Sequence, residues 1–258
     1  MRIRGGSGLG DAVYLRPVVD YYVKNSGSKI TVCSNYPDVF IGSGATVVPF
    51  SREKINVVGH YSLRKKEPNT NQWQDVCISA GVPGLALRFD WPVTNPQLIE
   101  RVRRAAAGRP VVLVHGGRSP MGRSDGFGAE LLPQAQAFAH AQAALRDCMF
   151  VRIGKGGNLY HIDSEMDLSD KTSICELIDL FCSCDMVLAQ CSYAVPLAEA
   201  FDKTLIAVWA HKGLTKGVPY IRQITPQKIL SKPTSWFIVD NWPKEEIQEE
   251  VNGVRLVC

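Results

Sequence analysis

Short apolar runs alternate along the chain with longer segments in which apolar residues recur at helical spacing. The short runs are typical of buried strands in a parallel sheet, and the longer segments are typical of helices that cover such a sheet. Strands are predicted at about residues 2–4, 29–33, 45–49, 110–115, 149–153, 185–189 and 204–208. Helices are predicted at about 12–24, 71–80, 95–107, 129–145, 173–183, 193–201 and 243–252. This alternation predicts an α/β fold.

The chain divides into two α/β units. The predicted helix at 95–107 ends at Gly108, and Pro110 then opens a new apolar strand that leads into a second glycine-rich turn. We therefore predict two Rossmann-like lobes, an N-terminal lobe of residues 1–108 and a C-terminal lobe of residues 109–240. Because ligands of open α/β sheets bind beyond the carboxyl ends of the strands, the two glycine turns are expected to face each other across a cleft.

Residues 241–258 are predicted to form a C-terminal helix that returns to the N-terminal lobe. Pro243 stands at its first turn, and Glu245 and Glu246 follow. Proline and acidic residues are both favoured at a helix N-terminus.

The first strand leads directly into a glycine-rich turn that ends in a carboxylate, Gly5-Gly6-Ser7-Gly8-Leu9-Gly10-Asp11. Such a turn lets backbone N–H groups approach a polar or anionic ligand closely. Its spacing does not match the dinucleotide fingerprint G-x-G-x-x-G, because the third glycine would fall on Asp11 or Val13. The second predicted strand ends in small neutral residues, and no Gly-Lys-Ser/Thr follows the turn. The sequence therefore argues against a nicotinamide, flavin or P-loop site.

Composition is that of an ordinary globular protein, with 45% apolar and 21% charged residues in a chain of 258. Eight cysteines are scattered without C-x-x-C spacing, which predicts reduced and mostly buried thiols. No stretch approaches 18 apolar residues, and the basic start runs into the glycine turn rather than into an apolar segment. We therefore expect a cytoplasmic protein without a transmembrane segment.

Charge is distributed unevenly between the two units. Residues 1–110 hold 15 basic against 8 acidic residues, whereas residues 111–258 hold 14 against 17. Residues 51–75 are polar, basic and without regular pattern, and they include Arg64, Lys65 and Lys66 next to aromatic side chains. A basic lobe of this kind could bind an anionic partner through contacts with phosphates and through stacking on aromatic side chains. Basic residues that are simply exposed to solvent would explain the same charge pattern.

Three stretches carry motifs of a known family. They are Gly10–Pro17, Val112–Ser119, and a long stretch that comprises Asp167–Leu177, Cys184–Gln190, Leu197–Phe201 and Leu205–Trp209. The first is similar to a G-D-x-x-x-x-x-P segment, the second to a strand that ends in a Pro-Gly-Ala-Ser-like turn, and the third to D-L-x-G-K-T-S-L-x-E-L with the strands and helix that follow it. These motifs resemble the ADP-heptose:lipopolysaccharide heptosyltransferases (glycosyltransferase family 9), which have the GT-B fold. The family's Asp-Ser/Thr-Gly-x-x-His is replaced here by Cys191–Pro196, where only the hydroxyl of Ser192 remains.

The resemblance implies a nucleotide-sugar-dependent, metal-independent and inverting glycosyltransferase, with a nucleotide-diphosphate sugar as co-substrate and no cofactor. Asp11 would be the catalytic base, although a carboxylate at this position also suits a helix cap. The acceptor would contact the basic N-terminal lobe, at Gly8, Gly10, Arg64, Lys65 and Lys66. The donor would be held by the C-terminal lobe, at Gly116, Gly117, Arg118, Ser119, Arg123, Lys155, Gly156, Ser192, Tyr193 and Glu199.

Several of these residues also have simpler explanations. Lys155 is also explained as a solvated loop residue, and Glu199 as a surface residue. His115 ends a predicted strand and is a candidate contact of the donor or the acceptor, but a hydrogen-bonded histidine in the core is an equal alternative. The acidic segment Asp163–Asp167 resembles a metal motif, but a solvated loop before the helix start at Ser173 accounts for it better. We predict no metal site.

The sequence leaves the acceptor open. No amphipathic membrane-facing stretch is evident in residues 51–75, and this slightly favours a hydroxymethylated base in DNA over a lipopolysaccharide or another glycan. A nucleotide-sugar-binding protein without catalysis and a nucleotide-sugar epimerase are further alternatives. The sugar, the nucleobase and the oligomeric state are not predicted.

Overall fold

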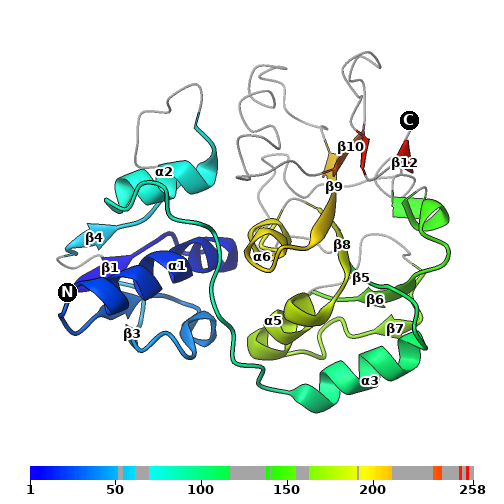
Figure 1. Ribbon diagram of the computed structural model, residues 1–258, viewed down its shortest axis with the longest axis horizontal. Helices are drawn as coiled ribbons and strands as arrows, with labels where there is room; N and C mark the ends of the chain where they lie inside the picture. Colours follow the sequence, from blue (N-terminus) through cyan, green and yellow to red (C-terminus); the bar gives the residue numbers. More distant parts are fainter. Residues whose placement is uncertain are drawn as a thin grey trace.

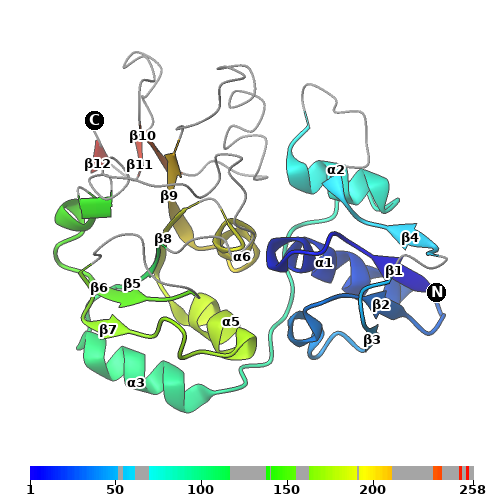
Figure 2. The same ribbon diagram turned by 180° about the vertical axis from the view of Figure 1, so that it is seen from behind.

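The chain forms two separate parallel sheets, each covered by helices, as the computed structural model shows (Figure 1). The structure describes residues 1–51, 55–61, 70–116, 138–139, 141–154, 163–190, 192–210, 235–239, 250–251 and 254–255. The two sheets lie side by side as an N-terminal and a C-terminal lobe, and α1 and α6 lie between them (Figures 1 and 2). The predicted α/β class with two lobes is confirmed.

The N-terminal lobe is built on a four-stranded sheet. Its strands are β1 (Arg2–Arg4), β2 (Thr31–Cys33), β3 (Thr46–Val48) and β4 (Val57–Val58), in the order β3-β2-β1-β4. Every neighbouring pair is parallel. The order runs in one direction from β1 through β2 to β3 and in the other direction from β1 to β4. The strand order therefore reverses between β1 and β4, and this is the switch point of the sheet.

Helix α1 (Leu9–Asn25) is the central helix of the N-terminal lobe. Eight consecutive residues from Ala12 to Val19 are buried, which a helix with one solvent face would not allow. They are buried because α1 contacts the helix α2 (Gln72–Ser79), the short helix η1 (Pro37–Phe40) and also α6 (Ala194–Ala200) of the other lobe. The helix that carries Asp11 is therefore held from several sides.

The C-terminal lobe is built on a parallel six-stranded sheet. Its strands are β5 (Val111–His115), β6 (Met149–Arg152), β7 (Met166–Asp167), β8 (Met186–Gln190), β9 (Thr204–Ala210) and β10 (Ser235–Val239), in the order β10-β9-β8-β5-β6-β7. All five residues of β5 are buried, as expected for the central strand of a covered parallel sheet. The switch point of this sheet lies between β5 and β8.

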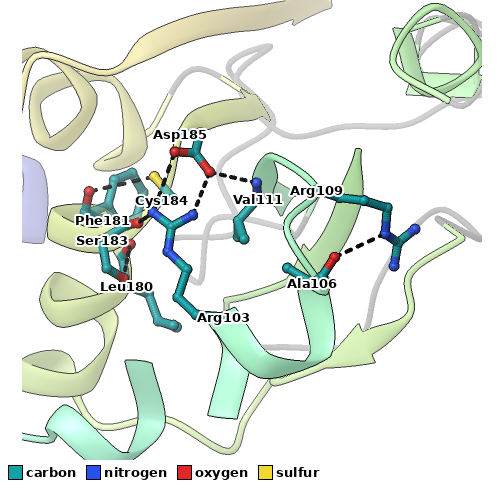
Figure 3. A network of polar contacts seen from close by, with 9 residues as sticks. All are labelled: Arg103, Ala106, Arg109, Val111, Leu180, Phe181, Ser183, Cys184 and Asp185. Atoms are coloured by element: carbon teal, nitrogen blue, oxygen red, sulfur yellow. Dashed lines mark hydrogen bonds and ion pairs between the residues drawn. The ribbon is translucent and has the colours of Figure 1, made fainter. Parts of the chain in front are cut away.

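Helices α3 (Pro96–Ala106) and α5 (Ile174–Ser183) pack on the C-terminal lobe. α3 contacts α5 and β5, although it precedes the predicted boundary at residue 108. Arg103 of α3 donates to Asp185, which also accepts the backbone N–H of Val111 at 2.7 Å (Figure 3). One carboxylate thus joins α3 to the start of the second sheet, and the chain passes from one lobe to the other before α3 begins.

The crossing segment is anchored on both lobes. On the N-terminal side, the buried Arg16 of α1 donates to the carbonyl of Asp90 at 3.3 Å, and its guanidinium lies 5.2 Å from the ring centroid of Phe89. On the C-terminal side, the fully buried carboxylate of Asp179 accepts the indole N–H of Trp91 at 2.6 Å and the hydroxyl of Thr94 at 2.7 Å. These contacts set the relative position of the lobes.

The seven predicted strands are confirmed, and so are the predicted helices except at 129–145 and 243–252. Of the helix at 129–145, residues 138–139 and 141–144 are described and helical. The sequence analysis missed β4, β7 and β10, which are short or follow segments without regular pattern. The six described cysteines are free, and four of them are buried, as predicted.

The predicted C-terminal helix does not extend to residue 252. The antiparallel strands β11 (Glu250–Val251) and β12 (Val254–Arg255) pair there instead, and the earlier part of the predicted helix lies outside the described residues. The intervening sequence Asn252-Gly253 is the commonest two-residue hairpin signal, and it outweighs the weak helical pattern before it. The hairpin is drawn on the side of the six-stranded sheet, away from the N-terminal lobe (Figure 1).

Candidate functional site

The glycine turn and the end of β4 meet at the switch point of the N-terminal sheet. The turn Gly5–Asp11 follows β1, and Gly59–Tyr61 follows β4, which pairs with β1. The Oδ1 atom of Asp11 lies 3.5 Å from Nε2 of His60, and the two side chains are only 15% and 18% exposed. A carboxylate and an imidazole are therefore paired where ligands of such sheets bind.

Asp11 is also part of the start of α1. It is the third residue of the helix, and its Oδ2 atom accepts the backbone N–H of Gly8 at 2.9 Å. This is the carboxylate half of a capping box, so the capping role anticipated for Asp11 is present. It occupies one carboxylate oxygen and leaves the other oxygen facing His60.

Gly6 makes the close approach of these two side chains possible. A Cβ atom at Gly6 would lie within 3.0 Å of both the Asp11 carboxylate and Nε2 of His60. Any side chain at position 6 would therefore displace one of them. The second glycine of the turn is required by the space that the pair occupies.

A second group of polar side chains lies at the switch point of the C-terminal sheet. His115 ends β5, and Ser192 follows β8, which pairs with β5. The Oγ atom of Ser192 lies 3.3 Å from Nδ1 of His115 and accepts the N–H of Ala194 at 3.2 Å. The hydroxyl proton of Ser192 is not used in the hydrogen bond from Ala194, so the hydroxyl can donate to Nδ1 of His115 in the tautomer that leaves Nδ1 unprotonated.

His115 is almost completely enclosed, with 4% of its surface exposed. Burial lowers the pKa of its imidazole from the usual 6.5 to about 4, so the ring is neutral at physiological pH. The ring of Tyr193 packs edge-on against it at a centroid distance of 4.8 Å, and burial raises the pKa of that phenol. Gly154, which has a φ of +118°, passes so close that a Cβ there would lie 2.7 Å from Cδ2 of His115.

The segment Asp167–Leu177 contains a residue with a left-handed backbone and the start of α5. Asp170 stands where the family motif has glycine, and its φ of +58° lies in the left-handed region, which Asp tolerates better than most residues. Ser173 and Glu176 form the predicted capping box at the start of α5, with Glu176 N–H donating to the Ser173 hydroxyl at 3.2 Å. The predicted helix start at Ser173 is therefore confirmed.

The two switch points belong to lobes that touch each other. Gly10 of α1 faces the start of α6, where a Cβ at Gly10 would lie 3.5 Å from Cα of Tyr193 and 3.8 Å from Cγ of Pro196. α1 and α6 lie side by side in both views (Figures 1 and 2). Asp11 and Ser192 each adjoin one of these contacting residues in the chain.

The remaining predicted site residues divide into two groups. Gly116 is buried directly after β5, and Tyr193 is partly buried before α6. Glu199 is buried in α6, with 7% of its surface exposed, so the alternative that it is a surface residue is wrong. The predicted donor and acceptor residues that lie outside the described part of the chain are Gly117, Arg118, Ser119, Arg123, Lys155, Gly156, Arg64, Lys65 and Lys66.

The acidic segment 163–167 makes structural contacts. Glu165 accepts the backbone N–H of Phe150 at 2.8 Å and pairs with Arg109 at 2.9 Å, and Asp167 lies 3.6 Å from Arg152. Among the described residues, no group of three His, Cys, Asp or Glu side chains could hold a metal ion. The same part of the chain contains no helix that is long and apolar enough to cross a membrane.

The position of His60 next to Asp11 was not predicted. His60 fell within the irregular basic stretch 51–75, because β4 was not predicted and nothing then indicated that residue 60 follows the strand beside β1. The two apolar residues Val57-Val58 before Gly59 are the only signal that could have revealed this strand.

The fold is that of GT-B glycosyltransferases. A glycosyltransferase of family 9 from Veillonella parvula matches with a TM-score of 0.57 at 10% identity, over 92% of this chain and 84% of that one. The ADP-heptose lipopolysaccharide heptosyltransferase II of E. coli matches with 0.50 at 10% identity, over 92% and 89%. E. coli heptosyltransferase WaaC with ADP matches with 0.50 at 11% identity, over 92% and 93%. No protein-family model and no curated protein sequence matches the chain.

Proposed function

We propose that this chain is a heptosyltransferase-like glycosyltransferase, which transfers a sugar from a nucleotide-diphosphate donor to a hydroxyl group of a glycan. The observation that carries the proposal is the placement of Asp11 at the N-terminal switch point, on a helix that packs against the start of α6 in the opposite lobe. The GT-B fold and the motif around Asp170 support it.

In the proposed reaction, Asp11 accepts the proton of the acceptor hydroxyl. The acceptor oxygen attacks the anomeric carbon of the donor, and the bond from that carbon to the diphosphate breaks with the electron pair leaving on the diphosphate. Attack on the face opposite the leaving group inverts the anomeric configuration. The partly buried surroundings of Asp11 limit its contact with water, which strengthens the electrostatic effect of the carboxylate.

The donor is proposed to bind beyond β5 and β8. Gly116, Ser192 and Tyr193 come from this edge of the sheet, and the resemblance adds Gly117, Arg118, Ser119, Arg123, Lys155 and Gly156. The cations of that set would offset the charge of the departing diphosphate, in a reaction that we propose to be independent of a metal. Glu199, which is buried in α6, is proposed to hydrogen-bond the nucleotide ribose.

The glycan acceptor is preferred to DNA. Two similar structures are heptosyltransferases, one of them named for its lipopolysaccharide and ADP-heptose substrates. The DNA hypothesis rested on the basic N-terminal lobe and on the lack of an amphipathic stretch in residues 51–75. Its proposed contacts Arg64, Lys65 and Lys66 lie outside the described residues, and no comparison supports it. ADP-heptose is accordingly the first donor to test.

The test is to incubate the protein with ADP-heptose and other nucleotide sugars, together with truncated lipopolysaccharide or hydroxymethylated DNA. We expect a mass gain of one sugar on the lipopolysaccharide, and loss of this activity in Asp11→Asn with donor binding retained. The exchange removes the negative charge but keeps the size of the side chain and an oxygen that can accept the N–H of Gly8, so lost folding would not explain the result. Transfer to DNA alone would overturn the acceptor, and turnover of no nucleotide sugar would overturn the function.

A further inference from the structure

We propose that His60 is a positioning residue for Asp11: its Nε2–H group holds the Oδ1 atom of the carboxylate in the orientation in which Asp11 removes the acceptor proton. This inference rests on the proposed function and names a residue that neither the motifs nor the comparisons assign. It starts from the 3.5 Å approach of the two side chains at the switch point of the N-terminal sheet.

The two oxygens of the Asp11 carboxylate face different groups. Each of its oxygens has two lone pairs, and Oδ2 uses one of them for the N–H of Gly8. That hydrogen bond completes the helix cap, so the cap does not need the contact between Oδ1 and His60. The contact with His60 restricts rotation of the carboxylate and leaves one lone pair on each oxygen for the acceptor hydroxyl.

The imidazole of His60 is itself held in place. The backbone N–H of His60 donates to the hydroxyl of Ser79 at 3.0 Å, and that hydroxyl donates to the carbonyl of Val76 at 2.9 Å. The backbone N–H of the preceding Gly59 donates to the carbonyl of Arg4 in β1 at 2.9 Å. A Cβ at Gly59 would lie 3.0 Å from Cδ1 of Leu15, so a side chain there would require Leu15 to shift. The backbone of residue 60 is therefore fixed between α2 and β1.

An aromatic stack fixes the ring as well. The imidazole lies on the ring of Tyr61 at a centroid distance of 4.5 Å with an interplanar angle of 23°. Tyr61 meets Tyr14 of α1 edge-on at 6.3 Å, and Tyr14 stacks on Trp73 of α2 at 6.2 Å. Because the ring is already fixed, little conformational entropy is lost when it orients the carboxylate. Precise positioning of a reacting group requires such a fixed support.

The glycine turn leaves space for Asp11 and His60 to approach each other. Gly6 has no side chain at the point where Asp11 and His60 approach each other, and any Cβ there would collide with both. A surface ion pair needs no such arrangement. The turn, the helix start and the end of β4 all converge on this one contact.

The experiment compares the variants His60→Ala and His60→Gln, with Asn56→Ala as the control. The amide N–H of glutamine reaches about as far as Nε2–H, so glutamine can still donate to Asp11, whereas alanine cannot. Asn56 is an exposed residue at the other end of β4, where its side chain accepts the N–H of Arg2 at 2.8 Å. Its loss perturbs the same strand away from the pair.

The measured quantity is the turnover of ADP-heptose at saturating acceptor. We expect His60→Ala to lower kcat about 10- to 100-fold with the KM for ADP-heptose unchanged. His60→Gln should recover most of this loss, and added imidazole should partly restore the alanine variant. A second measurement needs no activity: the imidazole nitrogen signals of His60 in the NMR spectrum should move in Asp11→Asn.

Each outcome decides the proposal. The proposal would be overturned if His60→Ala were as active as Asn56→Ala, or if His60→Ala changed only the KM for ADP-heptose. It would also be overturned if His60→Gln and His60→Ala were equally active, or if the NMR signals of His60 did not move in Asp11→Asn. If wild type and His60→Ala turn over ADP-heptose equally and Asp11→Asn does not, only the role of His60 fails. If the wild type uses no nucleotide sugar, the proposed function fails and the positioning role fails with it.

Discussion

Gly10 in the first lobe lies against the backbone of Tyr193 in the second, so that a Cβ added to Gly10 would sit 3.5 Å from Cα of Tyr193. This distance allows a methyl group in ordinary van der Waals contact and nothing larger. The contact joins the helix start that carries Asp11 to the helix start that follows Ser192.

Substitutions of Gly10 therefore depend on size. Gly10→Ala should be tolerated and should stabilise the protein by up to about 1 kcal/mol, because alanine is a better helix former. Gly10→Leu should destabilise it by about 1–3 kcal/mol, because the larger side chain must push α6 away. Denaturant unfolding measures the free energies, and small-angle scattering measures the separation of the lobes. A leucine variant with unchanged stability and scattering would show that the lobes do not meet here.

Gly6→Ala should separate Asp11 from His60 without unfolding the protein. The new methyl group would lie within 3.0 Å of both side chains, so one of them must move. We expect donor turnover to fall at least about 10-fold, while the melting temperature changes by only a few degrees. Ser7→Ala is the matched control, since Ser7 is exposed in the same turn. Equal activity of the two variants would contradict this prediction.

Asp179→Asn should be strongly destabilising. Its buried carboxylate accepts hydrogen bonds from the side chains of Trp91 and Thr94 and from the backbone of Asn95, and an amide cannot accept all of them. We expect a loss of about 2–4 kcal/mol in the free energy of unfolding.

Asp202→Asn is the control for this loss. Asp202 is 65% exposed, pairs with Arg88 at 3.7 Å, and has a left-handed φ of +56° that asparagine also adopts. Its substitution should change the free energy of unfolding by less than about 0.5 kcal/mol. Equal effects of the two substitutions would mean that Asp179 does not anchor the crossing segment.

His115 should make the protein less stable in acid. The pKa of its imidazole is about 4 in the folded protein and near 6.5 in the unfolded chain, so below pH 6.5 the unfolded chain binds a proton that the folded protein excludes. The contribution of the neutral imidazole to the free energy of unfolding is therefore fully present above pH 6.5. It is lost as the pH falls towards 4, by up to roughly 3 kcal/mol. Denaturant unfolding at pH 8 and pH 5 measures the loss.

The variant His115→Asn removes the titrating group. It should be less stable than the wild type at pH 8, because it leaves a cavity beside Tyr193 and Gly154. Its stability should nevertheless fall less between pH 8 and pH 5 than that of the wild type. An unchanged pH dependence would show that another group accounts for the loss.

Much of the fold could be predicted from local patterns. The strands β5, β8 and β9 are apolar runs that any buried parallel strand would show, and the capping pair Ser173 and Glu176 marks the start of α5. The motif around Asp170 also predicted a GT-B fold. These features depend on residues close together in the chain, so periodicity and short motifs reveal them.

The wrong and missing predictions concern elements that are short or weakly patterned. β4 and β7 have two residues each, too few for a period to be visible. At the C-terminal hairpin, a weak helical pattern precedes the turn signal Asn252-Gly253. The burial of Glu199 arises because α6 is buried along its whole length, and only the packing of the lobes shows this.

The amino-acid sequence by itself determined the α/β class, the two lobes, the glycine turn with its carboxylate and the apolar strands, because each is encoded by neighbouring residues. The pairing of Asp11 with His60, the contact of His115 with Ser192 and the anchoring of the crossing segment on Asp179 were decided only by the tertiary structure. Their partners are 49, 77 and 84–88 positions apart, as counted from the residue numbers. Strand order and lobe packing bring such residues together, and neither is written in a local pattern.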